Sequence, residues 1–513
     1  MRVINKKSLA SAIQYALGTM TLSAMISGSA NAESDRELYI EEVITTATTQ
    51  STLLSDTGIS ISSIDSMTMD EMGVNNFKDF TRTIPGVNFT EGNAPGEQTI
   101  IIRGVNFPSN RFQQSTVAVY IDELSLTQNG RNPDIDLIDM ERVEVLRGPQ
   151  GTLYGSSSMG GTLRYISNKP DTEEFTGDVE FGVEQTGSGD MGYRVNSTVN
   201  IPLTDTIAIR ASAYMKDLDG WIDSVGWAGS SSGSSNEIID GSLAEKNINS
   251  EETTGGRVAL RWSATEDLTV DLMYLNHDTE VDGLSNENPY WGEGKQQRRF
   301  KETYADKLET YNLALNYDVE EGTFLWNSSK MVRDYKRVSD PSRQRIGLAW
   351  WYGDFSDAFD YSLDAFTDAD GDFAGHAVRD RPIDFDLETH EFRFSSSFEG
   401  AMNFVAGAYF SKANNRWKQT ETYPGITESK GTLVPFAYPN FYLGTSYEDA
   451  ATTADFIVEA DGYSGQDTDS DGVVDIFQFE PVLYANAPLN KVILKIVKSR
   501  LNKRLSMAIL SMS

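Results

Sequence analysis

The chain has 513 residues, more than one ordinary soluble domain holds, so two units or one large β structure are expected. Hydrophobic residues make up 39%, and the sequence after the first thirty residues contains no apolar run long enough for a transmembrane helix, which leaves a β-barrel as the form of any membrane span. The formal charge of −33 argues against a nucleic-acid partner, and the lack of cysteine excludes disulfides, thiolate metal sites and cysteine catalysis.

The N-terminus has the pattern of a secretory signal. Arg2, Lys6 and Lys7 precede a weakly apolar stretch that ends in small residues at 30–32, so cleavage after Ala32 is expected. A short amphipathic helix is the alternative, but the order of charge, apolar stretch and A-x-A ending favours export. An exported protein without cysteine fits the bacterial envelope.

Residues 37–50 form a short β-prone segment bounded by acids and polar residues. The segment is too short to build a core of its own. An extended segment of this kind can add to the edge of a partner's sheet through main-chain hydrogen bonds. A flexible leader is an equally good interpretation of the pattern alone.

Residues 57–170 have the pattern of a compact α/β unit, in which short apolar runs alternate with polar segments and turn pairs. Helices are expected around Ser66–Arg82 and Asp136–Met140. Strands are expected in 99–104, 117–122, 143–148 and 163–168.

Glycines gather near the end of this unit, at Gly148, Gly151, Gly155, Gly160 and Gly161. The spacing matches neither a Walker loop nor a dinucleotide-binding turn, and no G-x-S-x-G elbow is present. Tight turns with positive φ and close backbone approach to a surrounding wall explain these glycines better than phosphate binding.

Several stretches in this part of the chain resemble one known family. "IIIRGV" (100–105), "VAVYIDE" (117–123) and "ERVEVLRGPQGTLYG" (141–155) resemble the plug domain of TonB-dependent outer-membrane receptors, and "IEEVITTAT" (40–48) resembles their TonB box. The resemblance covers roughly the first third of the chain. It implies an α/β plug domain followed by a transmembrane antiparallel β-barrel, with the glycines as plug turns. The residues it assigns to the TonB-binding segment are Glu42, Val43, Ile44, Thr45 and Thr46.

The sequence after the plug alternates as barrel strands do. In 206–216 the apolar residues Ile207, Ile209 and Met215 alternate with polar ones such as Arg210 and Lys216. Apolar residues should face lipid and polar ones the water inside. The same pattern recurs in 257–276, 311–329 and 390–410. A soluble sandwich would not need the long acidic connections between these hairpins, and a porin without a plug would leave 57–170 unexplained.

Two charged features invite a functional interpretation. Asp467, Asp469, Asp471 and Asp475 stand at the spacing of an EF-hand loop, but Gln478 replaces the bidentate Glu, so an outer loop with weak or no Ca²⁺ binding is favoured over a calcium site.

In the plug, charged residues lie on or beside β runs. The resemblance implies a latch in which plug arginines face acidic barrel residues; ordinary strand charge is the alternative. The candidate latch residues are Arg103, Arg147 and Glu144.

The end of the chain does not fit a complete barrel. About nine strands can be recognised before residue 415, against ~22 in plugged transporters. The tail 491–513 carries six basic residues and no acid in an acidic chain, which suggests a frameshift near Asn490; a basic amphipathic helix is the alternative. An open sheet edge in lipid leaves backbone groups unpaired, so stable insertion of such a wall is not expected.

The expected organisation is a signal peptide, a TonB-box leader, a plug, the N-terminal part of a barrel with about nine to ten strands, and an aberrant tail, at 1–32, 33–56, 57–170, 171–490 and 491–513. The resemblance implies an active transporter in the outer membrane of a Gram-negative bacterium. Its implied partners are TonB, outer-membrane lipid, and a small-molecule or metal-chelate ligand such as a ferric siderophore. As truncated, the chain is not expected to function. A calcium-dependent envelope adhesion protein and a nonfunctional fragment of a disrupted receptor gene are the alternatives. No cofactor beyond the possible Ca²⁺ is implied, and no nucleophile–base pair suggests an enzyme.

Overall fold

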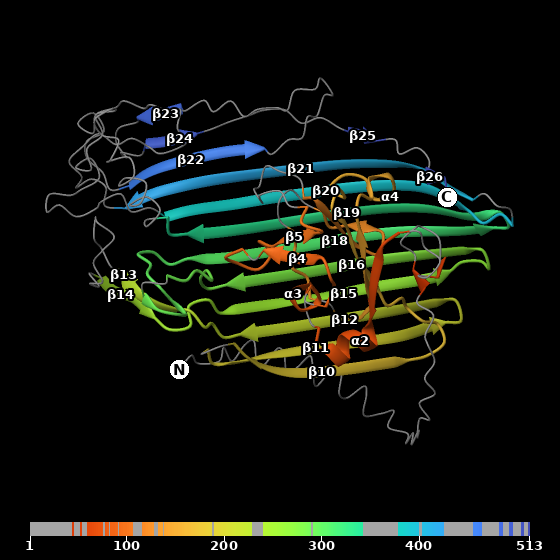
Figure 1. Ribbon diagram of the computed structural model, residues 1–513, viewed down its shortest axis with the longest axis horizontal. Helices are drawn as coiled ribbons and strands as arrows, with labels where there is room; N and C mark the ends of the chain where they lie inside the picture. The colour runs from red at the N-terminus through yellow and green to blue at the C-terminus, as the bar shows by residue number, and fades with distance from the viewer. Residues whose placement is uncertain are drawn as a thin grey trace, which may run out of the picture.

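The computed structural model describes residues 59–341 and 378–424 with short gaps, the longest at 106–114 and 228–239, together with isolated short strands before and after these ranges. Two parts are seen: a small α/β unit, which we call the plug, and a large curved sheet, which we call the wall (Figure 1). None of the described helices is long and apolar enough to cross a membrane.

The plug is built on a five-stranded sheet with the order β3-β8-β9-β6-β7, in which β6 and β9 are parallel and the other neighbours antiparallel. A separate pair, β4 and β5, lies beside it. The strands are β3 (Ile61–Asp65), β4 (Val87–Thr90), β5 (Thr99–Ile102), β6 (Val117–Ile121), β7 (Leu124–Ser125), β8 (Met140–Arg147) and β9 (Gly161–Ser167). The expected plug strands are therefore confirmed.

The helices of the plug differ from the expectation. The stretch expected as one helix is split into α2 (Ser66–Met72) and α3 (Phe77–Thr81). Asp65 caps α2 by accepting a hydrogen bond from the Thr68 amide (2.7 Å), and Gly73 ends it at φ 65°. The helix expected at Asp136–Met140 was wrong: none of the described residues there is helical, and Met140 already begins β8 opposite Ser167.

The wall is a sheet of fourteen strands whose main path runs β10-β11-β12-β15-β16-β18-β19-β20-β21-β22-β24-β23, while β25 and β26 also pair with β21. Its long strands are β10 (Thr176–Gln185), β11 (Met191–Thr204), β12 (Ile207–Leu218), β15 (Glu251–Ser263), β16 (Leu268–Val281), β18 (Thr303–Val319), β19 (Gly322–Ser339), β20 (Val378–Ser396) and β21 (Phe404–Pro424). These nine strands match the number recognised from the sequence before residue 415.

Short strands complete the description. β13 (Asp223–Trp227), β14 (Asp240–Glu245) and β17 (Lys295–Gln296) form a three-stranded sheet within the long connections. The last wall strands are β22 (Asp455–Tyr463), β23 (Val482–Ala485), β24 (Val492–Lys495), β25 (Arg504–Ser506) and β26 (Ser511–Met512). Ahead of the plug, β1 (Ile44–Thr45) pairs with β2 (Thr52–Leu53), and α4 (Gly151–Tyr154) follows β8.

The two faces of the wall differ as the alternation predicted. Val258 and Trp262 of β15 are 49% and 44% exposed, whereas Arg257, which precedes Val258 and points to the opposite face, is 4% exposed and donates to Asp139 of the plug. Outward aromatic residues gather near the short turns at 264–267 and 320–321; Trp326 stacks on Phe392 at 5.9 Å. Such an aromatic row is typical of a membrane interface of a barrel.

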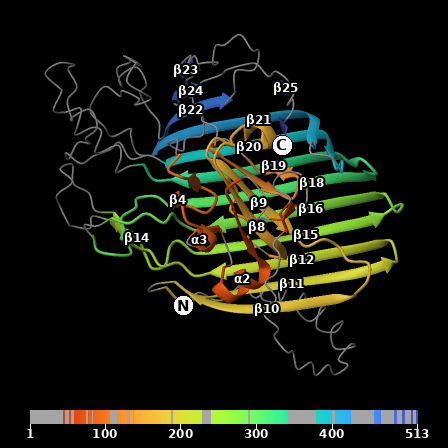
Figure 2. The same cartoon turned by 45° about the vertical axis from the view of Figure 1, so that its right-hand side comes forward.

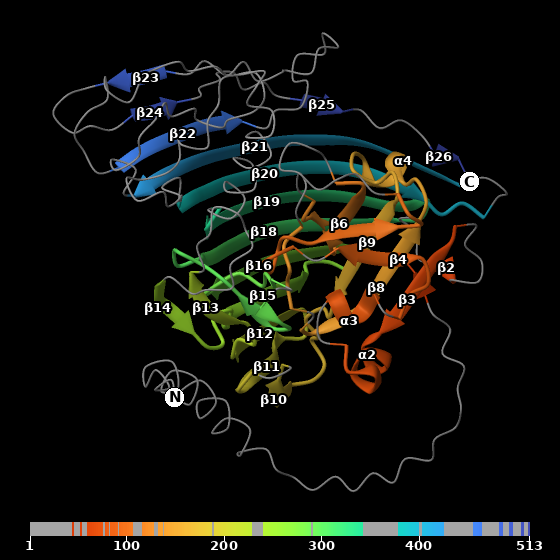
Figure 3. The same ribbon diagram turned by 60° about the vertical axis from the view of Figure 1, so that its left-hand side comes forward.

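The plug lies against the inward face of the wall (Figures 2 and 3). One hydrophobic cluster joins the two parts: plug residues such as Ile102, Val119 and Val143 belong to the same cluster as six wall residues. The wall residues are Met273, Leu275, Leu308, Met331, Phe385 and Leu387. Plug and wall therefore share a core instead of touching through a solvated gap.

The wall is not closed within the described residues. Its sheet has β10 at one edge and β23 at the other, and no pairing between described strands joins the two edges. On β10 the side chains of Phe181 and Val183 are 68% and 52% exposed. The structure therefore contains a plug and a curved, incomplete wall.

Candidate functional site

One charged contact between plug and wall centres on Asp139, whose side chain is 2% exposed. Arg210 of β12 donates to both carboxylate oxygens of Asp139 at 2.9 Å, and Arg257 of β15 donates to the same carboxylate. The plug also holds this carboxylate itself, through the Asn168 side chain at 2.9 Å. Asp139 takes φ 57°, a left-handed conformation that Asp tolerates better than most residues. One plug carboxylate thus bridges two wall guanidinium groups.

A second contact lies nearer the long connections. Arg337 of β19 pairs with Glu97 of the plug at 2.6 Å. Arg333, fully buried on the same strand, pairs with Asp306 at 2.6 Å and donates to the Gly96 carbonyl at 3.3 Å. A Cβ on Gly96 would lie 2.7 Å from both the Arg333 and the Asp306 side chains, so the contact requires glycine there.

A third contact is a chain of alternating charges. Glu144, fully buried in β8, pairs with Arg164 of β9 at 2.8 Å; Arg164 approaches Glu123 at 3.7 Å, and Glu123 pairs with Arg393 of wall strand β20 at 3.3 Å. Burial raises the pKa of Glu123, but Arg393 and Arg164 outweigh it, so the carboxyl pKa lies below its ordinary value. Glu123 therefore stays charged and links the plug sheet to the wall.

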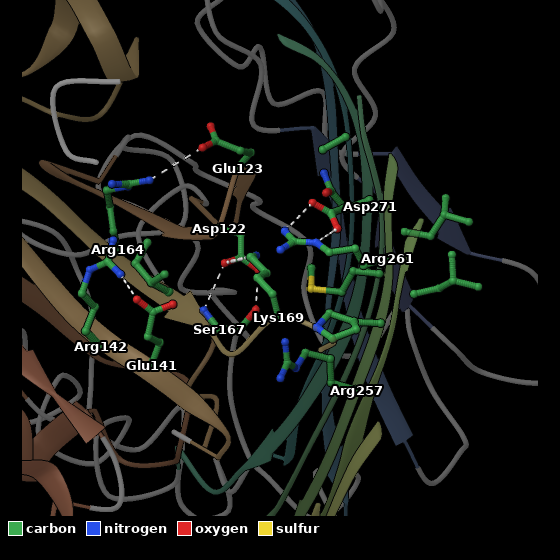
Figure 4. Close-up of a pocket in the computed structure, with 18 of the residues that line it drawn as sticks. Asp122, Glu123, Glu141, Arg142, Arg164, Ser167, Lys169, Arg257, Arg261 and Asp271 are labelled. Atoms are coloured by element: carbon green, nitrogen blue, oxygen red, sulfur yellow. Dashed lines mark hydrogen bonds and ion pairs between the residues drawn. The ribbon is translucent and has the colours of Figure 1, made fainter. Parts of the chain in front are cut away.

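A cavity of about 690 Å³ lies between plug and wall, and Glu123, Arg164 and Arg257 of these contacts are among the residues that line it (Figure 4). On the plug side, the Asp122 carboxylate forms an ion pair with Lys169 at 2.7 Å and accepts a hydrogen bond from the Ser167 hydroxyl at 2.7 Å. On the wall side, the Arg261 guanidinium makes a bidentate ion pair with the Asp271 carboxylate, with hydrogen bonds of 2.8 and 2.9 Å. Burial raises the pKa of Asp122, but Lys169 and Ser167 bring it below its ordinary value, so this carboxyl is also charged.

The predicted TonB-binding segment is described in part. Ile44 and Thr45 form β1 and pair with Leu53 and Thr52. The other members of the segment, Glu42, Val43 and Thr46, lie outside the described residues.

The predicted latch residues make different contacts from those expected. Arg147 donates to Ser62 at 2.9 Å and to the Pro85 carbonyl at 3.2 Å, both within the plug. Arg103 sits in a turn with φ 52° and donates its backbone amide to the Gly86 carbonyl at 2.8 Å. The prediction paired plug arginines with wall acids. The ion pairs described above instead join arginines on the inward face of the wall to acids of the plug. Glu144 reaches the wall indirectly, along the charged chain described above.

The glycine positions serve the plug's own strands. Gly148 and Gly155 have φ of 101° and 67°, as expected for turns, while Gly151 begins α4. A Cβ on Gly161 would lie 2.3 Å from the Leu146 carbonyl oxygen, and one on Gly160 would lie 3.3 Å from that of Thr116. The close approach is thus between plug strands, not toward the surrounding wall.

The possible calcium ligands Asp467, Asp469, Asp471 and Asp475 lie outside the described residues. Within the described part of the chain no three His, Asp or Glu side chains are grouped as metal ligands. The acids that do matter for docking, Asp139, Glu97 and Glu123, were not singled out from the sequence. The arginines on the inward face of the wall were the available clue to these acids, because a buried cation requires an acidic partner close by.

Comparison with known proteins agrees with this architecture. Residues 54–162 match the family model of the TonB-dependent Receptor Plug Domain. The chain is 29% identical over 204 residues to the pesticin receptor of Yersinia pestis, which covers 40% of the chain and 28% of that protein. It is 32% identical over 191 residues to the ferripyoverdine receptor of Pseudomonas aeruginosa, covering 37% of the chain and 22% of the receptor. The chain thus spans less than a third of the length of these two relatives.

Solved structures share the fold. The ferric yersiniabactin uptake receptor of Yersinia pestis superposes with a TM-score of 0.56 at 18% identity, over 72% of this chain and 50% of that one. The siderophore receptor PiuA of Acinetobacter baumannii gives 0.51 at 16% identity, over 75% and 49%.

A plug docked on the inward face of an antiparallel wall is the arrangement that this chain shares with the ferric yersiniabactin uptake receptor and PiuA. Residues 54–162 are therefore similar to the plug domain of TonB-dependent receptors, and the chain shares the fold of solved receptors that contain such a plug.

Proposed function

We propose that the chain acts in the TonB-dependent uptake of a ferric siderophore. The main support is the coincidence of a family-specific plug with a wall that holds it by buried charge pairs, as at Asp139. Relatives named as ferripyoverdine and ferric enterobactin receptors favour an iron chelate over other scarce ligands. The ligand would bind on the side of the long connections.

The partner is TonB, and its contact is the segment Glu42–Thr46. Extended backbone of this kind can add to the edge of a partner's sheet. Fourteen residues, 47–60, lie between Thr46 and β3, so a pull on the segment would load β3 and its ladder with β8 once these residues are extended. The plug would then shift within the wall without any covalent step.

Uptake by cells tests this proposal. A host that lacks its own siderophore receptors is supplied with the full chain and given radio-iron as ferripyoverdine or ferric enterobactin. Uptake should appear with the natural sequence and fall at least tenfold with Val43→Pro, because proline removes a backbone donor from the paired segment. Gln50→Pro, outside the segment, is the control. Absence of uptake with the natural sequence, or equal uptake by both variants, would contradict the proposal.

Two further expectations remain predictions. A frameshift near Asn490 is the alternative to uptake by this chain, since it would leave the natural sequence without transport. Sequencing the gene tests it, and an intact reading frame with no barrel-coding continuation downstream in another frame would contradict the frameshift. Ca²⁺ binding at Asp467–Asp475 is tested by calorimetry on the full chain with and without Asp471→Asn. Calcium-dependent adhesion that survives Val43→Pro would favour the envelope-binding alternative over transport.

A further inference from the structure

The plug presents two carboxyl groups to the inward face of the wall near the long connections. Asp134 and Asp136 lie in the segment between β7 and β8. The Lys216 ammonium, near the end of β12, lies 3.6 Å from the Asp136 carboxylate and 2.7 Å from that of Glu251, the first residue of β15. We call Asp134, Asp136, Lys216 and Glu251 the docking cluster, because plug and wall contribute two residues each.

The docking cluster contains three carboxyl groups and a single ammonium group. The side chains of Asp136, Lys216 and Glu251 are 8%, 14% and 19% exposed. Asp134 feels the attraction of Lys216, while Asp136 and Glu251 repel its charged form. Negative charge that lacks a counter-charge is costly where little water reaches it, and a carboxyl group there binds a proton instead. The charge balance of the cluster therefore favours one protonated carboxyl group.

Asp134 is the carboxyl group that retains the proton. Burial raises its pKa to about 7; Lys216 opposes the rise, and Asp136 and Glu251 add to it. The Gln98 side chain, also in the plug, donates a hydrogen bond of 2.6 Å to this carboxyl group. The phenol groups that the charge of Asp134 also reaches are those of Tyr165 in the plug and Tyr214 in the wall.

On the wall side, the docking cluster continues into a chain of hydrogen bonds. Glu251 accepts a hydrogen bond of 3.0 Å from the Thr253 hydroxyl, which lies 3.0 Å from the Thr279 hydroxyl. The Thr279 hydroxyl lies 2.9 Å from Nε2 of His277, and Nδ1 of His277 lies 2.6 Å from the Tyr214 hydroxyl. These five residues belong to β12, β15 and β16, so the chain stays in place when the plug moves. Of the docking cluster, the two plug carboxyl groups alone would then enter water.

We propose that Asp134 makes plug docking depend on a proton: the docked plug holds one proton on this carboxyl group, and movement of the plug away from Lys216 and Glu251 releases that proton to water. Acid then favours the docked plug. One proton bound to the docked state alone lowers the ratio of docked to released plug by up to tenfold per pH unit, between about pH 4 and about pH 7. The inference does not depend on iron uptake, since it concerns only the position of the plug.

The sign and the pH range of the effect distinguish Asp134 from other groups at the boundary. Glu123, which pairs with Arg393, has a pKa below its ordinary value of 4.5, so this contact weakens only in stronger acid. A buried neutral histidine such as His277 would give the opposite sign, because acid would charge it and favour release. Weaker docking as pH rises from 5 to 7 therefore indicates a carboxyl group that is protonated in the docked state.

Thiol labelling at a wall site covered by the plug tests the proposal. Thr310 of β18 is fully buried, and its cross-strand neighbours Leu275 and Met331 belong to the hydrophobic cluster shared with the plug. The chain has no cysteine, so Thr310→Cys supplies a single thiol in the purified full chain. Its rate of reaction with a small charged reagent is divided, at each pH, by the rate of Glu266→Cys in an exposed turn. This ratio should rise at least tenfold between pH 5 and pH 7.

Two carboxyl variants identify the group that binds the proton. Asp134→Asn should hold the labelling ratio at its pH 5 value, because the amide is neutral at every pH. Glu302→Gln is the matched control and should keep the rise. Burial raises the pKa of Glu302 to about 7 as well, but its carboxyl group accepts a hydrogen bond from the Asp340 amide, beside the end of β19.

Asp136→Asn tests the same inference if Asp134→Asn does not fold. Removing the negative charge that repels ionised Asp134 should move the rise of the labelling ratio to lower pH. A merely structural role of this segment would change the ratio equally at every pH. The inference is overturned by a ratio that stays constant or falls between pH 5 and pH 7 with natural Asp134, by a rise that persists in Asp134→Asn, or by an unshifted rise in Asp136→Asn.

Discussion

At the scale of single residues, plug docking depends on a few buried charges, and Asp139 is the clearest. Asp139→Asn would leave Arg210 and Arg257 facing a neutral amide, and breaking one partner of a buried ion pair typically costs about 3–5 kcal/mol. We expect a fall of that order in the free energy of unfolding, measured by denaturant titration in detergent. Glu266→Gln, an exposed turn residue, is the control. A fall in the free energy of unfolding no larger than that of the control would contradict the stabilising role of the Asp139 ion pairs.

Asp134 of the plug should make stability depend on pH. Burial raises its pKa to about 7; Lys216 opposes the rise and Asp136 and Glu251 add to it, while Gln98 donates to the carboxyl at 2.6 Å. Between its unfolded value near 3.8 and about 7, the folded state holds a proton that the unfolded state has lost. Stability from this group is therefore present below about pH 4 and is lost as pH rises to 7, by at most about 1.4 kcal/mol per pH unit. Asp134→Asn should flatten the melting temperature over this range; an unchanged slope would show that another group titrates.

At the scale of elements, the glycines shape the plug sheet more than they fit it to the wall. Gly161 of β9 cannot take a Cβ without meeting the Leu146 carbonyl of β8, whereas Gly241 of β14 has no atom within 4 Å of that position. Gly161→Ala should lower stability by about 1–3 kcal/mol, the usual cost of overpacking, and Gly241→Ala should change it little. Thermal unfolding of both variants checks this. Equal melting temperatures of the two variants would mean that β8 can shift at Leu146 to accommodate the added methyl group.

Strands could be predicted from the sequence where a local pattern, the alternation of apolar and polar residues, determines their structure. Alternation alone located the wall strands and their faces, since the register of a half-buried strand follows its side-chain period. Local rules failed at Asp136–Met140, where pairing of Met140 with Ser167 overrides any helical tendency. The docking acids could not be found in the same way, because their partners lie on strands seventy to 270 residues away, as for Asp139 with Arg210 and Glu123 with Arg393.

At the scale of the whole molecule, plug and wall form one packing unit, because six apolar residues of the wall, Leu308 among them, belong to the same hydrophobic cluster as the plug core. A destabilising substitution in the wall should therefore also lower the stability of the plug. Leu308→Ala removes a fully buried side chain, and such truncations cost about 2–5 kcal/mol through lost contacts and the cavity left behind. Hydrogen exchange of the plug amides in β5 and β8 should accelerate correspondingly, although neither strand is altered. Leu272→Ala, on the outward face of β16 and 45% exposed, is the matched control and should leave those plug amides protected. If Leu308→Ala speeds exchange in β18 and its wall neighbours alone, the plug is stable independently of the wall and the shared cluster does not couple them.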